Sequence, residues 1–554
     1  MTTLEEAEVV EAQSSSSMLY PILIVTAILT IIHYWRENSR FVKLGNKLPG
    51  PPTLPFIGNI HMIFGITSSN EIMEKALEIS KDYPPVVRGW IGTWNLFVFL
   101  MDPRDIEIIL SSHVHIDKSV EYRMFKPWLG DGLLISTGDK WRAHRKLIAP
   151  TFHLNVLKSF VGLFNKNGQT LVQRLKKEVG KPSFDAHDYL SETTVDTLLE
   201  TAMGVKRTSQ DGEGYDYAMA VMKMCDIIHQ RTYKVWLRLE PIFRLVGMAK
   251  EQLQHLNTIH GLSSKVIKKK KEEFLKRKES PVINNYEAAE YLETEKEAQK
   301  GTYFDQSQGL KDDLDDDVGE KKRMAFLDLM IESAQSGAVI SDDEIKEEVD
   351  TIMFEGHDTT AAASSFTLCL LGIHQAVQQK VMDELYQIFG DSDRPATFAD
   401  TLEMKYLERV ILETIRLYPP VPIIARQLKE DVQLASGDYL LPAGCTVVIG
   451  TYKVHRNPEI YPNAEEFNPD NFLPEKMQNR HYYGYIPFSA GPRSCVGRKY
   501  AMLKLKILLS TVLRNYKIVS DIKESEFKLQ ADIILKRTDG FRIKIEPRKS
   551  VKAM

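Results

Sequence analysis

The longest uncharged apolar run of the chain lies near its N-terminus. Residues 18–35 (MLYPILIVTAILTIIHYW) include no Asp, Glu, Lys or Arg. A helix crosses a bilayer with about 17 to 25 such residues, so the run predicts a transmembrane anchor; a buried core helix is the alternative. The preceding tail, residues 1–17, carries only acidic charges, whereas four basic residues follow within residues 36–47. This asymmetry predicts a lumenal tail and a cytosolic body.

A proline-rich stretch separates the apolar run from the body of the chain. Residues 48–59 (LPGPPTLPFIGN) hold four prolines and two glycines, which cannot continue a helix. We therefore expect residues 36–62 to form a basic, proline-rich tether and residues 63–554 to form one large domain.

The body alternates long helical patterns with short β-like runs, which predicts a mainly α fold with small β-sheets. Residues 86–100 (VVRGWIGTWNLFVFL) predict a β-hairpin. Residues 438–450 (DYLLPAGCTVVIG) predict a second hairpin, turned at Pro442, Ala443 and Gly444.

One stretch departs from the composition of the rest. Residues 281–320 hold twelve acidic and three basic residues and end in DDLDDDVGE. So polar a segment cannot build a core, and it predicts a surface insertion. The insertion is either a solvated linker between two helices or a docking or regulatory element.

The most informative helix begins at Ser341. Ser341 and Glu344 have the spacing of a capping box, and no proline interrupts the pattern up to Gln375. The middle of this helix is apolar, yet it contains FEGHDTT, in which Glu355 and Thr359 lie four residues apart and share a face. Buried polar groups need partners or a function. The pattern fits a buried core helix with a local kink whose polar groups are hydrogen-bonded. It fits equally a helix that packs against a cofactor.

Charge and cysteine content narrow the class of protein. The 554 residues carry a formal net charge of −4, which argues against a nucleic-acid binder. The four cysteines form no CxxC pair, so a disulfide framework or structural zinc site is not expected. Cys225 and Cys369 lie on apolar helices and Cys445 in a strand, where a buried, unreactive thiol fits. Cys495 differs: it lies in PFSAGPRSCVG, residues 487–497, immediately before a predicted helix. A glycine-bearing loop lets a thiolate approach a flat iron macrocycle.

Two further pairs are weak when taken alone. Glu413 and Arg416, three residues apart, can form an ion pair on a helix. Trp141 and Arg145, four residues apart in WRAHRK, share a helical face, and such a pair is usually a surface contact.

Together these motifs resemble the cytochrome P-450 superfamily of haem-thiolate monooxygenases, from the anchor to the C-terminus. The ligand-loop pattern F-x-x-G-x-R-x-C-x-G is met by Phe488, Gly491, Arg493, Cys495 and Gly497. The resemblance implies the cytochrome P-450 fold, with a long distal helix and a cysteine-ligand loop, and a haem b cofactor.

The resemblance also implies roles for individual residues. Cys495 would be the axial ligand of the haem iron, and Glu413 and Arg416 would form the scaffold behind it. The third scaffold position of the family, usually Arg or His, falls on Asn471, which cannot repeat that charge. Residues implied near the haem propionates are Trp141, Arg145, Arg426 and Arg493.

Residues 348–360 (EVDTIMFEGHDTT) resemble family four within this superfamily. The resemblance implies that Asp358 and Thr359 deliver protons during oxygen activation. It implies that Glu355 can form an ester with a haem methyl group. The acidic insertion and residues 489–515 resemble the insect G subfamily, which is linked to cuticular hydrocarbon synthesis by oxidative decarbonylation of long-chain aldehydes.

Three functions therefore compete: aldehyde oxidative decarbonylase, fatty-acid ω-hydroxylase, and a haem-thiolate sensor without turnover. The Asp358/Thr359 pair argues against the sensor, since ligand sensing needs no proton delivery. The family implies an endoplasmic reticulum membrane enzyme that uses O2 and receives electrons from NADPH through a reductase. Basic residues expected to face the reductase are Arg142, Lys146, Arg498, Lys499, Lys504 and Lys506.

Overall fold

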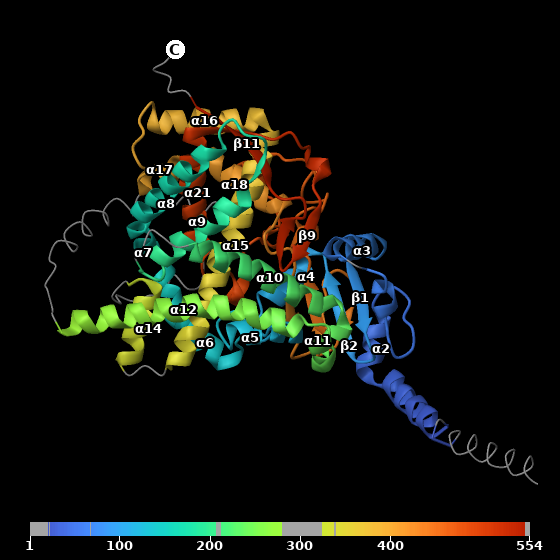
Figure 1. Ribbon diagram of the computed structural model, residues 1–554. Helices are drawn as coiled ribbons and strands as arrows, with labels where there is room; N and C mark the ends of the chain where they lie inside the picture. Colours follow the sequence, from blue (N-terminus) through green and yellow to red (C-terminus); the bar gives the residue numbers. More distant parts are fainter. Residues whose placement is uncertain are drawn as a thin grey trace, which may run out of the picture.

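Most of the chain in the computed structural model is helical (Figure 1). The structure describes residues 20–21, 23–66, 68–205, 212–279, 324–336 and 340–548. Residues 23–38 are helical. The labelled α-helices are α2 (Arg40–Lys47), α3 (Ser69–Asp82), α4 (Pro103–Leu110), α5 (Lys126–Leu129), α6 (Gly138–Ile148), α7 (Leu154–Ser159), α8 (Val161–Leu175), α9 (Ala186–Glu200), α10 (Glu213–Tyr233), α11 (Glu240–Leu245), α12 (Met248–Glu279), α14 (Phe326–Gln335), α15 (Asp342–Ile373), α16 (Gln375–Phe389), α17 (Phe398–Glu403), α18 (Lys405–Leu417), α19 (Thr451–Val454), α20 (Pro474–Met477) and α21 (Arg498–Asn515).

The strands form small sheets, as the sequence predicts. The largest has the order β1-β2-β7-β4, in which only β2 and β7 are parallel; the others are β3-β11-β8, β9-β10 and β5-β6. The strands are β1 (Val86–Ile91), β2 (Asn95–Leu100), β3 (Phe184–Asp185), β4 (Ile424–Gln427), β5 (Val432–Gln433), β6 (Leu440–Leu441), β7 (Thr446–Ile449), β8 (Tyr516–Val519), β9 (Leu529–Asp532), β10 (Ile534–Arg537) and β11 (Arg542–Pro547).

One of the two predicted hairpins is confirmed and the other is wrong. β1 and β2 pair antiparallel from Val86 opposite Leu100 to Ile91 opposite Asn95. The second segment does contain two strands, but β6 pairs with β5, whereas β7 pairs with β2 and β4. Its turn therefore carries the chain from one sheet to another. Alternating apolar residues predict a strand, but they do not choose its partner.

The predicted long helix is confirmed as α15, which crosses the middle of the molecule (Figure 1). Its 32 residues would span about 48 Å, and Ser341 and Glu344 form the predicted capping box. α15 packs against α9, α12, α18 and α21, so nearly every side chain in its second half is buried. The large apolar core of the protein is built around it.

A second, smaller core lies under the β1-β2-β7-β4 sheet and joins the N-terminal part to it. Val42 of α2 is fully buried, and Arg36 lies over the Trp90 ring at 5.1 Å. The proline-rich stretch runs along β1, where the Arg88 N–H donates to the Pro49 carbonyl (2.8 Å) and the Asn59 N–H to the Trp90 carbonyl (2.7 Å).

Three predicted segments lie wholly or partly outside the described residues. The lumenal tail, residues 1–17, and the acidic insertion, residues 281–320, are wholly outside, and residues 18, 19 and 22 of the predicted anchor are also not described. Within the described ranges, no single helix has both the length and the hydropathy of a membrane span. The bent pair of α15 and α16, which meet at 109°, reaches those limits by length and composition alone.

Candidate functional site

A cavity of about 690 Å³ lies between the long helix α15 and the loop that carries Cys495. From the loop side it is lined by Phe488, Arg493, Cys495 and Gly497. From α6 it receives Trp141 and Arg145, and from α15 it receives Glu355, Gly356, Thr359, Thr360 and Ala363. The structure thus brings to one cavity motifs that lie more than 350 residues apart in the sequence.

The backbone of the loop explains its glycines. Gly491 has a φ of +68°, and a Cβ at this position would collide with the carbonyl oxygen of Leu110. Only glycine fits both constraints. The Cys495 N–H donates to the Phe488 carbonyl at 2.9 Å, which closes the loop, and α21 starts three residues later. These contacts fix the direction in which the Cys495 side chain points.

The Cys495 sulfur faces the cavity and is accessible from it, in contrast to the other cysteines. Cys225, Cys369 and Cys445 are buried, as the sequence predicts. Desolvation inside the cavity, followed by the nearby Glu355 carboxyl, raises the pKa of the Cys495 thiol to about 11. A thiol becomes a ligand only as the thiolate, so binding at Cys495 requires a cation that replaces its proton.

The described residues contain no group of three or more His, Cys, Asp or Glu side chains able to hold a metal ion. Cys495, which lines the cavity, can supply a single thiolate ligand to a metal whose remaining ligands come from a cofactor. A haem iron meets this condition, because the porphyrin supplies four nitrogens and the protein supplies the axial ligand.

Buried cations gather at one end of the cavity. Arg493 donates to the carbonyls of Leu134 and Ser136, and its guanidinium lies 4.7 Å from the Trp141 ring. Its Nε atom is buried and has no hydrogen-bond partner. Burial, together with the charge of Arg426, lowers the pKa of Arg493 to about 9. The buried guanidinium groups of Arg493 and Arg426 would be stabilised by a bound anion, and the two propionates of haem could supply it.

Lys118 belongs to the same group, although sequence reasoning missed it. It lines the cavity, and burial followed by the charges of Arg426 and Arg493 lowers its pKa well below the usual value. Arg426 itself is buried behind this lining, and its guanidinium donates to the Ala425 carbonyl (3.1 Å). Lys118 lies outside any helix or strand, so no periodic pattern marks it.

The α15 wall confirms that Glu355 and Thr359 share a face, since both line the cavity. The Thr359 hydroxyl donates to the Glu355 carbonyl at 2.8 Å. Burial raises the pKa of the Glu355 carboxyl to about 7.

Asp358, by contrast, points away from the cavity. Its carboxylate is fully buried and pairs with Lys536 of β10 at 3.0 Å. Burial opposes the charge of Asp358, but Lys536 and the neighbouring histidines outweigh it and lower its pKa. The predicted role of Asp358 in proton delivery therefore stays a prediction. From this position its carboxylate could act only through Thr359.

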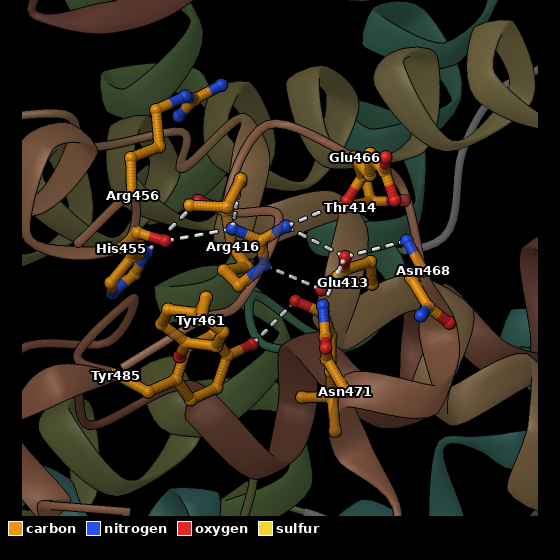
Figure 2. A network of polar contacts seen from close by, with 12 residues as sticks. Glu413, Thr414, Arg416, His455, Arg456, Tyr461, Glu466, Asn468, Asn471 and Tyr485 are labelled. Carbon is orange, nitrogen blue, oxygen red and sulfur yellow. Dashed lines mark hydrogen bonds and ion pairs between the residues drawn. The ribbon is translucent and has the colours of Figure 1, made fainter. Parts of the chain in front are cut away.

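The scaffold pair Glu413–Arg416 is fully buried and bidentate, with N–O distances of 2.7 and 2.8 Å (Figure 2). Asn471 donates to Glu413 at 3.0 Å, so the third position keeps the contact without the charge. Arg480 donates to the Asn471 carbonyl (2.8 Å) and lies 4.2 Å from the Tyr461 ring. Arg480, which is not part of the motif, thus places a positive charge next to Asn471.

The expected basic surface needs a correction. Lys504 and Lys506 are 2% and 1% exposed, so they cannot present charge to a partner protein. Lys506 pairs with Glu408 and donates to the Thr401 carbonyl. Arg142 and Lys146 of α6 are exposed, and Arg498 and Lys499 are partly exposed.

Comparison with known proteins agrees with this geometry. The family model Cytochrome P450 matches residues 48–545. Cytochrome P450 4g15 of Drosophila melanogaster is 56% identical over 97% of this chain and 98% of its own length. Cytochrome P450 4g1 of the same species is 52% identical, covering 96% and 95%. Cytochrome P450 4V2 of Homo sapiens is 37% identical, covering 89% and 88%.

Replacement of Cys495 tests the assignment of the axial ligand. Cys495→Ala should abolish the thiolate-type Soret band of the reduced carbon monoxide complex, because no other described cysteine reaches the cavity. Cys225→Ala, Cys369→Ala and Cys445→Ala are the matched controls and should keep the band. An unchanged spectrum of Cys495→Ala would refute the assignment.

Proposed function

The chain belongs to family four of the cytochrome P450s, the haem-thiolate monooxygenases, and from this premise we propose that it converts long-chain fatty aldehydes to hydrocarbons. The reaction is RCHO + O2 + NADPH + H⁺ → RH + CO2 + H2O + NADP⁺. One carbon leaves as carbon dioxide, and a reductase passes on the two electrons. Bound haem would supply the oxygen chemistry, with Cys495 as its ligand and the Arg493 end of the cavity as the seat of its propionates.

The observation that carries this proposal is the apolar lining of the cavity away from Cys495. It extends to α3, β1 and β2, where its lining includes Ile72, Met73, Ile79, Val87, Phe97 and Phe99. Each methylene buried on such surfaces contributes about 0.8 kcal/mol. A long alkyl chain would therefore bind tightly without an ion pair.

Three of the cations that line the cavity, Lys75, Arg88 and Arg238, are already engaged by contacts within the chain. Arg88 donates to the Leu48 carbonyl at 2.9 Å, and Arg238 donates to the Thr232 carbonyl at 2.7 Å. Lys75 pairs with Glu78 at 2.8 Å. A substrate carboxylate would have to displace such contacts, whereas an aldehyde or alkyl end would not. This favours the aldehyde over the fatty acid that ω-hydroxylation would use.

We further propose that Thr359 handles the proton nearest the reaction. Thr359 lines the cavity, and its hydroxyl proton, now donated to the Glu355 carbonyl, would pass to the reacting group once the hydroxyl turns from that carbonyl. Asp358, kept anionic by Lys536, would act one residue behind it.

Membrane attachment is part of the same proposal. The uncharged run at residues 18–35 would anchor the chain in the endoplasmic reticulum, with the large domain in the cytosol. Exposed apolar side chains on the segment from Val235 to α12 support contact with lipid: Trp236, Leu239, Leu245, Val246 and Leu253. Long-chain aldehydes partition into the same phase.

Glu355 offers a test of covalent haem attachment. If its carboxyl forms an ester with a haem methyl group, haem should stay on the polypeptide after turnover and denaturation in acidic organic solvent. Glu355→Gln should release it, because an amide cannot form that ester. Glu347→Gln, on the same helix but outside the cavity lining, is the control and should retain the haem. Free extraction of all haem from the wild type would exclude the link.

The exposed bases of α6 should guide the reductase. Charge reversal at Arg142 and Lys146 should slow reductase-supported turnover several-fold, most strongly at low salt, and spare peroxide-supported turnover. Lys380→Glu on α16, at the opposite end of the molecule, should change neither (Figure 1). Equal losses in both assays would reject a docking role for α6.

Product analysis separates the two enzyme functions. Given a C18 aldehyde, O2, NADPH and reductase, the purified protein should release a C17 alkane and carbon dioxide. The two functions place opposite ends of the chain at the reaction centre, so their products differ. If only ω-hydroxylated products appear, across aldehydes and acids of several lengths, the decarbonylase proposal is wrong and the fatty-acid hydroxylase replaces it.

A further inference from the structure

Lys504 is a buried lysine that the proposed mechanism leaves unused. It lies on α21, nine residues after Cys495, and is 2% exposed. Its Nζ atom donates to the Gly356 carbonyl of α15 at 2.9 Å. Within the described residues, no carboxylate lies close enough to form an ion pair with it. The buried ammonium group is therefore stabilised by the Gly356 carbonyl and by the Tyr500 ring, whose centroid is 5.2 Å away.

The acceptor is placed at the centre of the α15 wall. Gly356 lines the cavity between Glu355 and Thr359. Its carbonyl lies inside the helix, where it accepts the backbone N–H of the next turn, and the Thr360 hydroxyl, shared with the His357 carbonyl, also lies 3.1 Å from it. A Cβ at Gly356 would lie 2.9 Å from the methyl groups of Leu198, because α9 approaches closely on another side. This turn is thus fixed by a contact from α9 and by a hydrogen bond from α21.

We propose that Lys504 is a positioning residue that ties the helix following the Cys495 loop to the Glu355–Thr359 turn of α15. The bond links the two walls of the cavity directly, and it sets how far Glu355 and Thr359 stand from the Cys495 side. α21 connects Lys504 to the Cys495 loop, and its buried side chains make this helix a rigid element.

The surroundings of Lys504 support this role over simple stabilisation. Burial lowers the pKa of the amine to about 7, so keeping a lysine here costs free energy that an apolar residue of equal length would not. Tyr500 is already bonded to Thr201 at 2.8 Å and needs no further partner. A residue kept for stability alone would be better replaced by methionine.

Lys506 provides a matched control on the same helix. It is equally buried, but its Nζ atom bonds Glu408 of α18 at 2.5 Å and the Thr401 carbonyl of α17 at 2.9 Å. Lys506→Met leaves a buried carboxylate without its cation and should lower the thermal midpoint. Lys504→Met removes a buried amine that has no counter-ion and should leave the midpoint unchanged or raised.

The experiment measures α15 directly in the holoenzyme. Hydrogen exchange of a peptide spanning residues 353–363 should be about two- to tenfold faster in Lys504→Met, since one hydrogen bond to the Gly356 carbonyl is lost. The low-spin ferric electron paramagnetic resonance signal should shift, while the reduced carbon monoxide band stays at its wild-type position. Lys506→Met should change neither α15 readout.

Two further variants keep the test decisive. Lys504→Arg retains a charged donor and should restore slow exchange. Lys504→Gln retains a polar head group but ends one bond short of Nζ, so residues 353–363 should exchange fast in this variant too. It provides the same test if Lys504→Met fails to fold. The proposal is overturned if Lys504→Gln exchanges as the wild type does, or if the Lys504 and Lys506 variants loosen residues 353–363 alike.

Discussion

The buried ion pair between Glu413 and Arg416 is the interaction on which the geometry of the site depends. A guanidinium presents its donors in a fixed fork, and here every arm is used. Two arms reach Glu413, and the others reach the carbonyls of His455, Ala464 and Glu466. The pair therefore joins α18 to a long irregular segment that has little regular structure of its own. Removing either charge would leave the other buried and uncompensated, at a cost of about 3–5 kcal/mol.

His455 carries this constraint to the cysteine loop. The backbone N–H of Ile486 can only donate, and it lies 2.8 Å from Nε2 of His455. Nε2 must accept, so Nδ1 holds the proton and donates to the Arg416 carbonyl at 3.2 Å. Burial lowers the pKa of His455 to about 3, which keeps the ring neutral, as this arrangement requires. Ile486 leads directly into the Cys495 loop, so the scaffold behind the cavity determines where the sulfur lies.

The parts of the site that sequence predicts are those in which local geometry demands a residue type. Gly491 is one, because its backbone excludes any side chain. The shared face of Glu355 and Thr359 is another, since helical periodicity alone brings them together. The capping box at Ser341 is of the same kind.

What sequence could not predict depends on partners that are distant along the chain. Lys504 and Lys506 look like surface bases, and only the fold shows that a carbonyl of α15 and Glu408 receive their head groups. Asp358 is adjacent to Thr359, yet Lys536, 178 residues away, turns it from the cavity. The strands at residues 440–449 were visible, but their division between two sheets is decided by β5 and β2.

The uneven charge of the cavity bears on how a long substrate would lie. The charges of Arg493 and Lys118 affect one another, and this end of the cavity suits the propionates of haem. The rest of the lining is mostly apolar, and its cations Lys75, Arg88 and Arg238 are already bonded within the chain. One end of an aliphatic chain must rest in that remainder while the other reacts. If the reacting end is the aldehyde, a methyl group rests there and no polar group is desolvated. If the reacting end is the methyl group, a carboxylate must rest there, where it is desolvated unless it displaces the contacts that already hold Lys75, Arg88 and Arg238. The distribution of charge thus favours the orientation in which the carbonyl carbon meets the Cys495 side.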